Sequence, residues 1–551
     1  MSELLARPFA DNRQTVTDGP ETPAAVATLV APDQRQLPPV TPRQPEAPAA
    51  TPAHRRRAGR WALAGLLAAQ AFGSLRLRNS VFQDEALYLW AGHQETAHFL
   101  HGAPLFGNFA SYFSGTPGLY PVIASVIDTV YGLAGARLFS LIWMLIASLC
   151  VFGVSRRLFA ASVAAPAVVA FALSGPVLFM GHLATFDAMC VGLLALAAYA
   201  AVRAAGARRP GWALLVGPLV VAAVLSKYAG ALFVPTIFGI LLLESRRRRG
   251  WLVAVVNVVV AAAAAGLVTV VVLHQFGTSV LAGLRATTTN RTVLLRAQPW
   301  PLLHKSLALG GFFALFALVG CLALPRRQRL LGTLLFGTVL LAPAYHVYKG
   351  EPVSLPKHIG FGMFFAAPLV GRALSRCAGR RFSHLSGRRF AAAVAVGLLL
   401  VATGFTQSSS LFHEWSNSDS LVVTLKSMVR PGSGHILAEE AEVPRYRLRG
   451  LVDPWQWSDL NWFEYTDQAG VHRAGLDAYQ AAIKDRYFDV IVLRYGANAG
   501  TAMAVHHDIE TSGGYDLVAT LPFSTSFGTG AYSVWRVTSA AHATSGTGVQ
   551  G

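Results

Sequence analysis

Long apolar runs separated by short, arginine-rich connections make up the chain from about residue 59 to residue 406. An α-helix needs about 20 apolar residues to cross a hydrocarbon core about 30 Å thick, and most of these runs approach that length. Because several runs are shorter, we expect tilted helices or shifted boundaries. The pattern predicts eleven membrane-spanning helices, at residues 59–76, 137–154, 160–180, 183–202, 212–227, 229–244, 251–273, 306–324, 330–346, 358–375 and 390–406.

The two ends of the chain and the region after residue 406 lack these runs. Residues 1–53 are rich in Pro, Ala, Thr and Gln without an apolar period, which predicts a disordered tail, and residues 540–551 predict a second, flexible tail. Between residues 407 and 539, strand-like runs alternate with helical patterns, which predicts a small α/β domain. Its strands are expected at 435–438, 488–493, 517–521 and 533–537, and its helices at 418–429, 476–486 and 501–511.

The positions of lysine and arginine predict how the helices are oriented. With a cytoplasmic N-terminal tail, the six inner connections carry 22 Lys and Arg residues and the longer outer connections only nine. This asymmetry follows the positive-inside rule, which places basic connections in the cytoplasm. We therefore expect a multi-pass plasma-membrane protein with a transmembrane domain over 54–406, a first outer loop over 77–136 and an extracytoplasmic C-terminal domain over 407–539.

An apolar stretch within the first loop could be mistaken for a further span. Residues 119–135 contain Asp128 together with Gly and Pro breaks. A charge at the centre of a bilayer costs roughly 2.5–3.5 kcal/mol on insertion scales. A span here would also place every later basic connection on the wrong side. We predict instead a helix that lies in or dips into the outer interface.

Composition and charge agree with a membrane protein rather than a nucleic-acid-binding one. The 551 residues are 53% hydrophobic and 13% charged, whereas soluble domains carry about 25% charged residues. The net charge of +18 comes from basic residues in short connections between apolar runs, without a basic stripe interleaved with aromatics. We expect membrane lipids as partners and no nucleic acid.

An adjacent acidic pair, Asp84 and Glu85 in FQDEALYLWAGHQ, follows the first predicted span and is the strongest candidate for chemistry. A structural role is also open, because Asp84 is placed to cap the following helix and Glu85 would then lie in its first turn. The two roles are compatible, since one carboxylate oxygen can cap the helix while the other reaches a substrate. Under the predicted topology, the pair faces the exterior.

In these residues the chain resembles the family 39 type of membrane glycosyltransferases, which includes protein O-mannosyltransferases and aminoarabinose transferases. The resemblance covers roughly 60–405 and rests on the Asp-Glu pair, on ARLFSLIWMLIASLCVFGVSRRLF at 136–159, and on Asp187 in LATFDAMCVGLLALAAYA. It implies a polytopic α-helical membrane protein of GT-C type, here with about eleven transmembrane helices and a small C-terminal α/β domain. Members transfer a sugar from a polyprenyl monophosphate to an acceptor hydroxyl.

The resemblance also implies roles for the acidic residues. Asp84 would be the general base of an inverting transfer, since an ionised carboxylate can accept the hydroxyl proton as the sugar C1 becomes electrophilic. Glu85 would position the acceptor or the helix. Asp187 would lie beside Asp84 and orient substrate or a metal ion, although an aspartate that merely bonds a neighbouring serine or backbone group remains open.

Cations near the outer helix ends are candidates for binding the donor phosphate, whose charge on departure requires cations nearby. Arginine binds phosphate through a planar fork, and lysine through a compact charge. Each such residue could equally extend to the membrane interface without binding substrate. The candidates are Arg291 and Arg296, which share one loop, and Lys227, Lys357 and His358.

The predicted donor is a polyprenyl-phosphate sugar, and no further cofactor is firmly expected. Relatives often carry a His-Pro-Pro type segment late in the first loop, whereas this chain has Gly115, Thr116, Pro117 and Gly118 there. A metal-binding role for a histidine in that segment therefore cannot be transferred. We predict no tightly bound metal, and leave a divalent cation open.

Two other hypotheses compete with a hexosyl- or pentosyltransferase. A lipid or glycan transporter or flippase would favour mid-span charges and breaks in matched halves, and the sequence shows no internal repeat. A transferase requires Asp84, Asp187 and the outer cations to converge in one pocket, whereas a non-catalytic scaffold does not. The acceptor, whether protein, polysaccharide or glycolipid, is left open.

Overall fold

The computed structural model describes residues 52–538 apart from 209, 288–289, 291–295 and 378–386. The chain divides into two units, Met1–Arg56 and Arg57–Gly551, and nearly all described residues belong to the second. Both predicted tails lie outside the described residues, except for residues 52 and 53, with which the first helix begins.

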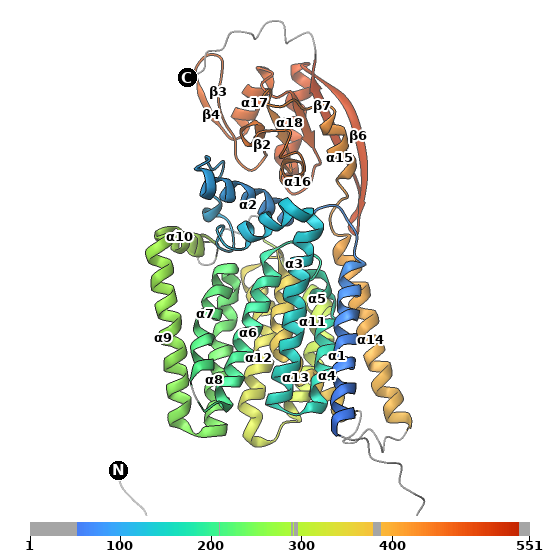
Figure 1. Ribbon diagram of the computed structural model, residues 1–551. Coiled ribbons are helices and arrows are strands. Elements are labelled where there is room, and N and C mark those ends of the chain that lie inside the picture. Colours follow the sequence, from blue (N-terminus) through green and yellow to red (C-terminus); the bar gives the residue numbers. More distant parts are fainter. Residues whose placement is uncertain (1–51, 209, 288–289, 291–295, 378–386, 539–551) are drawn as a thin grey trace, which may run out of the picture. The chain divides into compact units, whose positions relative to one another are not determined.

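Each of the eleven apolar runs is helical, and long helices run side by side through the bundle (Figure 1). Among the described residues, seven helices are long and apolar enough to cross a membrane, two further apolar helices are shorter, and no membrane is present. The helices at these runs are α1 (Pro52–Leu75), α3 (Tyr120–Leu158), α4 (Ala161–Ala172), α5 (Gly175–Met180), α6 (Phe186–Gly206), α7 (Gly211–Ser226), α8 (Val234–Arg249), α9 (Trp251–Phe276), α11 (Pro299–Leu322), α12 (Arg329–Lys349), α13 (Leu355–Cys377) and α14 (Gly387–Phe412).

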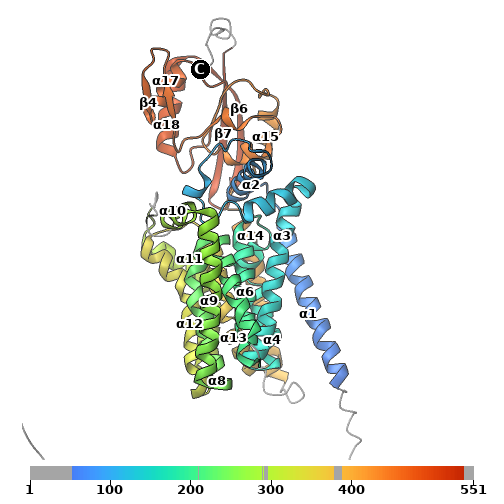
Figure 2. The same ribbon diagram turned by 60° about the vertical axis from the view of Figure 1, so that its left-hand side comes forward.

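Helix α6 forms the centre of the bundle and α9 its periphery. In the most apolar 18-residue stretch of α6, 83% is buried inside the protein, against 11% in the corresponding stretch of α9. Small residues dominate α6 and allow close packing against α3, α7 and α8; a Cβ at Gly192, for example, would lie 2.4 Å from the Trp143 ring. Helix α9 is apolar on all sides, as expected of a helix that faces lipid. Figure 1 shows α9 at the left-hand edge of the bundle, and in Figure 2 this side faces the reader.

Two predicted helices are interrupted. The run 160–180 is divided into α4 and α5 around Leu173 and Ser174, where Gly404 of α14 packs so closely that a Cβ would meet the Leu173 carbonyl oxygen. Helix α3 changes direction at Gly132, which has φ 65° and ψ −169°. The stretch predicted as a separate helix at 119–135 is therefore the first part of α3 and contains this kink near its end. Its location in the membrane interface stays a prediction.

The remaining described elements form the first loop, short helical turns and the C-terminal region. Helix α2 packs against both α3 and α16, so it links the bundle to the C-terminal region. The elements are α2 (Gln83–His101), η1 (Phe109–Ser111), η2 (Tyr228–Phe233), α10 (Thr278–Thr287), η3 (Arg326–Gln328), α15 (Asp419–Lys426), β1 (Ile436–Ala438), α16 (Glu442–Arg447), η5 (Pro454–Gln456), β2 (Trp457–Ser458), β3 (Glu464–Thr466), β4 (His472–Ala474), α17 (Leu476–Lys484), β5 (Val490–Leu493), α18 (Ala499–Ser512), β6 (Tyr515–Thr525) and β7 (Gly528–Val537).

A small mixed sheet forms the core of the C-terminal region. Its strand order is β2-β1-β5-β7-β6, with β3 and β4 as a separate pair. Strands β2, β1 and β5 are parallel, whereas β7 is antiparallel to both β5 and β6. The four residues of β5 are all buried, as expected of a central strand. The predicted fold class, a helical membrane protein with a small C-terminal α/β domain, is confirmed.

Candidate active site

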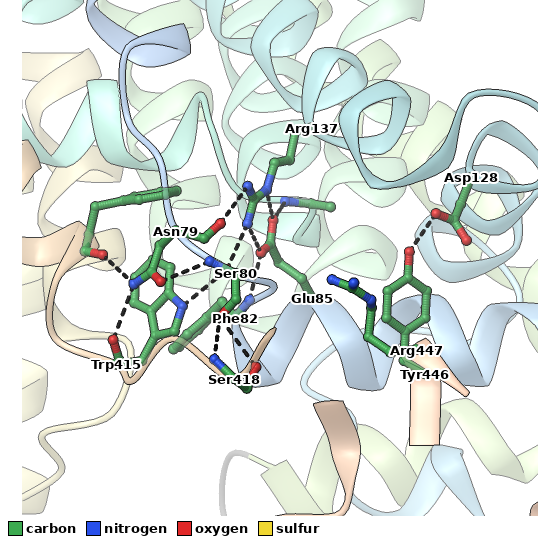
Figure 3. Close-up of polar contacts among 12 residues, drawn as sticks. Asn79, Ser80, Phe82, Glu85, Asp128, Arg137, Trp415, Ser418, Tyr446 and Arg447 are labelled. Carbon is green, nitrogen blue, oxygen red and sulfur yellow. Dashed lines mark hydrogen bonds and ion pairs between the residues drawn. The ribbon is translucent and has the colours of Figure 1, made fainter. Parts of the chain in front are cut away.

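Glu85 holds the beginning of α2 to the bundle. Its buried carboxylate accepts hydrogen bonds from Arg137 (2.8 Å at Oε1 and 2.7 Å at Oε2), from the Ala184 amide at 2.7 Å, and from the Phe82 amide at 2.8 Å. Figure 3 shows this group of contacts, in which Arg137 also reaches the carbonyl oxygens of Asn79 and Ser80. Both carboxylate oxygens are thus satisfied, and Glu85 joins α2 to α3 and to the turn before α6.

The expectation that Asp84 caps α2 is wrong. The helix begins at Gln83 with Phe82 as its N-cap, and Glu85, not Asp84, turns back to accept from the Phe82 amide. Asp84 lies inside the first turn of the helix, and its side chain makes no capping bond. Asp84 instead points to Lys357, whose Nζ donates to its Oδ2 at 2.6 Å.

Asp84, Lys357, Asp187 and Lys227 form a chain of alternating charges, called here the charge chain. Lys357 Nζ lies 2.6 Å from Asp84 Oδ2 and 3.3 Å from Asp187 Oδ2, and Lys227 Nζ lies 2.7 Å from Asp187 Oδ1. The Asp187 side chain is fully buried and both lysines nearly so, whereas that of Asp84 is 26% exposed. Matched charges make this burial tolerable, because an unpaired buried charge is very costly.

The helix ends explain why these residues can lie here. Asp187 is in the first turn of α6, where the positive end of the helix dipole favours an anion. Lys227 is the C-cap of α7, where the negative end favours a cation. Lys357 enters from the first turn of α13. Four segments far apart in the sequence therefore meet at one end of the bundle.

A cavity of about 170 Å³ adjoins the charge chain at Lys227. Its walls are largely apolar, and its polar groups include His346, Glu351 and His358. Ring nitrogens link the two histidines, His346 Nε2 to His358 Nδ1 at 2.8 Å, while His346 Nδ1 donates to the Glu351 carbonyl oxygen at 2.5 Å. With a proton on its Nδ1, a neutral His346 has Nε2 as an acceptor, so His358 Nδ1 carries the proton of the bond between the two rings. In a neutral His358 the other ring nitrogen, Nε2, is then an acceptor. His358 must therefore be protonated to donate to a phosphate.

The predicted cations divide into three groups. Lys227 and His358 line the cavity, whereas Lys357 lies between the two aspartates. Arg296 is exposed and packs beside Gly350, next to Glu351 in the cavity wall. Arg291 lies outside the described residues. The structure thus brings Asp84, Asp187, Lys227 and Lys357 into direct contact, with His358 close by.

Sequence reasoning missed Arg137 and His346 as parts of this region. Arg137 lies near the start of a predicted span, and an arginine at such a position generally needs an acidic partner. That partner, Glu85, is 52 residues away in the sequence. His346 gave no signal beyond its place near the end of a predicted span, because its role depends on His358 across two helices.

A further buried carboxylate, Asp128, connects the first loop to the C-terminal region. Its Oδ1 accepts from the Tyr446 hydroxyl at 2.6 Å, and its Oδ2 from Arg449 at 3.0 Å and from His93 Nε2 at 2.7 Å. Figure 3 shows Tyr446 pointing at Asp128. These bonds tie the first part of α3 to α2 and to α16.

Within the described residues, no group of three or more His, Cys, Asp or Glu side chains is arranged to hold a metal ion. The charge chain brings two carboxylates together, but lysines occupy the positions between and beside them. The chemistry available at this site is therefore that of a partly exposed carboxylate beside buried ammonium groups.

Comparisons with known proteins give the same fold. A family model described as dolichyl-phosphate-mannose-protein mannosyltransferase matches residues 121–274. No match was found among curated proteins. The chain is similar to the solved structure of ArnT from Cupriavidus metallidurans bound to undecaprenyl phosphate, with 17% identity, a TM-score of 0.54, and coverage of 89% of this chain and 98% of that one.

Two further solved structures share this architecture. One is the archaeal oligosaccharyltransferase AglB from Archaeoglobus fulgidus in complex with an inhibitory peptide and a dolichol phosphate (13% identity, TM-score 0.50, 86% of this chain and 74% of that chain). The other is the arabinofuranosyltransferase AftD from Mycobacteria (16% identity, TM-score 0.50, 88% and 40%). The resemblance predicted from the sequence is thereby confirmed: the chain has the fold of the GT-C membrane glycosyltransferases.

Proposed function

We propose that the chain transfers a sugar from a polyprenyl-monophosphate donor to an acceptor hydroxyl at the outer membrane face, with Asp84 as general base and inversion at the sugar C1. The observation that carries this proposal is the charge chain, which leaves Asp84 partly exposed at one end and reaches the cavity through Lys227 at the other. Similar structures contain undecaprenyl phosphate or a dolichol phosphate, which supports a lipid-phosphate donor.

The contacts of Asp84 suit a general base. Lys357 holds Oδ2, and Oδ1 has no hydrogen-bond partner among the described residues, so it is available to an acceptor hydroxyl. As the acceptor oxygen forms its bond to C1, its proton passes to Asp84 and the bond between C1 and the phosphate oxygen breaks. The bonding electrons leave with the phosphate, and attack from the opposite face inverts C1.

The charge chain also explains how the leaving phosphate could be stabilised at the right moment. Before reaction, the charges of Asp84 and Asp187 balance those of Lys357 and Lys227. When Asp84 takes the proton, the chain gains a net positive charge as the phosphate gains negative charge. Such stabilisation acts mainly in the transition state, which is the kind that accelerates a reaction.

For the donor phosphate itself we propose Lys227, Arg296 and a protonated His358, with Arg291 as a further candidate. Lys227 and His358 line the cavity, and Arg296 lies near its rim. Lys357 is better suited to position Asp84, because its Nζ lies between the two carboxylates and its side chain does not line the cavity.

The proposed orientation places the N-terminus in the cytoplasm and the domain over 407–539 outside, at the plasma membrane. In Figure 1 the basic connections lie at the end of the bundle opposite α2, which supports this orientation. The basic residues are Arg156 and Arg157 at the end of α3, Arg203 at the end of α6, Arg246, Arg247, Arg248 and Arg249 at the end of α8, and Arg326 and Arg327 before α12.

The proposal can be tested by mass spectrometry of polyprenyl phosphates and envelope glycans from cells in which the gene is deleted. We expect one lipid-linked sugar to accumulate, and expression of the intact protein to restore the normal profile. Asp84→Asn should fail to restore it. Asp477→Asn, which changes an exposed carboxylate on α17, is the matched control and should restore it. Restoration by Asp84→Asn would refute the role of Asp84.

A further inference from the structure

A second cavity lies where α2 meets the C-terminal region, about 360 Å³ in volume and distinct from the charge chain. Its walls come from α2, from the segment after it and from residues 449–454. Trp90, Gln94, Phe106, Arg449 and Pro454 are among the residues that line it. The volume falls within the range of about 300–1,000 Å³ that is usual for small-molecule sites.

Gln94 is the clearest sign that this cavity binds a ligand. The residue is only 9% exposed, and its Oε1 accepts a hydrogen bond from the Phe106 amide at 2.9 Å. That bond fixes the orientation of the side-chain amide. Its Nε2 is buried and has no hydrogen-bond partner among the described residues. Buried donors are almost always paired, so this amide lacks an acceptor that a ligand could supply.

The charges around the cavity favour an uncharged ligand. Arg449 and His93 also line it, and both bond to the same Asp128 oxygen, at 3.0 Å and 2.7 Å. The guanidinium charge is thus balanced by a carboxylate that is itself fully buried. An anionic ligand would have to compete with Asp128, whereas a neutral polar ligand would not.

The apolar groups favour a saccharide over a peptide. Phe106, which lines the cavity, is 42% exposed. Exposed aromatic faces can cover the C–H face of a sugar ring, while amide and guanidinium groups meet its hydroxyls. An extended peptide would instead be recognised through backbone bonds to a strand edge, and no described strand lines this cavity.

We propose that this cavity binds a neutral saccharide unit of the acceptor, with the Gln94 Nε2 donating to a sugar hydroxyl and Phe106 covering a ring face. This inference rests on the proposed transferase function. Gln94 is ten residues beyond Asp84 on the same helix, which separates them by about 15 Å along its axis. The bound unit is therefore remote from the reacting hydroxyl, and the acceptor is an oligosaccharide or longer glycan.

Saturation-transfer NMR on the full chain in lipid nanodiscs, without glycosidic detergent, tests the binding directly. The probes are the neutral trisaccharides mannotriose, maltotriose and arabinotriose. We expect ring-proton signals from at least one of them, with the intact protein and equally with Asp84→Asn. Because binding is measured without turnover, this result does not depend on whether Asp84 is the base. Absence of signal from all three probes would overturn the proposal.

Two variants localise the signal. Gln94→Glu keeps the oxygen that accepts from the Phe106 amide but lacks the Nε2 donor, and Phe106→Ala removes the ring. Gln94→Glu should weaken binding of the trisaccharide by roughly fivefold, the usual effect of one net hydrogen bond. Phe106→Ala should also weaken binding, because the ring contact with the sugar is lost. Unchanged binding in both variants would overturn the proposal. A serine-rich peptide probe that binds the intact protein and is lost in these variants would assign the cavity to a peptide, and would also overturn it.

Discussion

Two adjacent carboxylates lie in the first turn of α2, and their surroundings differ in how completely the carboxylate oxygens are bonded. Around Glu85 every carboxylate oxygen has two donors, and both Glu85 and Arg137 are buried (Figure 3). In the charge chain, Asp84 is partly exposed and has one oxygen held by Lys357. The difference separates an acid that supports the fold from an acid that can exchange a proton, although the two are adjacent in the sequence.

Removal of Arg137 should have the largest effect on stability. In Arg137→Leu the buried Glu85 loses its fork of two hydrogen bonds, and breaking a buried pair typically costs about 3–5 kcal/mol of the free energy of unfolding. Thermal unfolding in nanodiscs checks this. The double variant Glu85→Leu with Arg137→Leu should recover part of the loss, since no charge is left unpaired. An unchanged unfolding temperature in Arg137→Leu would contradict a structural role for the pair.

Removal of Lys357 should affect transfer more than stability. Lys357→Met deprives Asp84 of its partner, while Asp187 keeps Lys227 at 2.7 Å. We expect a fall in kcat of roughly 10²-fold, comparable to loss of one preorganised donor at an active site. Lys305→Met is the matched control, because Lys305 is a half-exposed lysine that pairs with Glu414 at 3.0 Å. Equal rates for the two variants would argue against the charge chain.

Loss of the Asp128 carboxylate charge should loosen the C-terminal region with a smaller effect. Asp128→Asn weakens the bonds from Tyr446, Arg449 and His93, and should lower the free energy of unfolding by about 1–3 kcal/mol. Tyr446→Phe removes a single bond and should cost less. Limited proteolysis between residues 412 and 419 is the readout, and cleavage at the wild-type rate in both variants would contradict this account.

A pH dependence of stability is expected at Glu442 of α16. Burial raises the pKa of Glu442 from its ordinary 4.5 to about 7. Between about pH 4.5 and about pH 7, Glu442 is therefore protonated in the folded state and ionised in the unfolded state. The free energy of unfolding consequently falls as pH rises through this range. In Glu442→Gln this fall is absent. We expect Glu442→Gln and the intact protein to unfold at nearly the same temperature at pH 4.5, and the variant to unfold at a higher temperature above pH 7. A difference in unfolding temperature that does not change with pH would contradict this prediction.

Much of the fold could be predicted because apolar period and arginine placement are local signals. All four predicted strands and all three predicted helices of the C-terminal region are present, at β1, β5, β6 and β7 and at α15, α17 and α18. Strands β2, β3 and β4 were not predicted, because these short strands, unlike the apolar and fully buried β1, contain polar residues and do not form an apolar run. The interruption between α4 and α5 was missed because it depends on close contact with α14.

The candidate site was predictable residue by residue but not as a set of pairs. Asp84, Asp187, Lys227 and Lys357 each stood out as charges near helix ends, yet up to 273 residues separate the bonded partners. The capping role left open for Asp84 belongs to Glu85; both acids suit a helix start, and only the position of Phe82 decides between them. The sequence did not single out Gln94, because its unpaired amide and the cavity beside it are apparent only in the folded structure.

The most direct test of the central claim is the rate of transfer by purified Asp84→Asn in nanodiscs, supplied with the lipid-linked sugar that accumulates in the deletion strain. Loss of a general base should lower the rate by about 10²–10⁴-fold. The unfolding temperature should stay close to that of the intact protein, because Lys357 retains Asp187 as a partner. A folded Asp84→Asn protein that transfers at the wild-type rate would contradict the account.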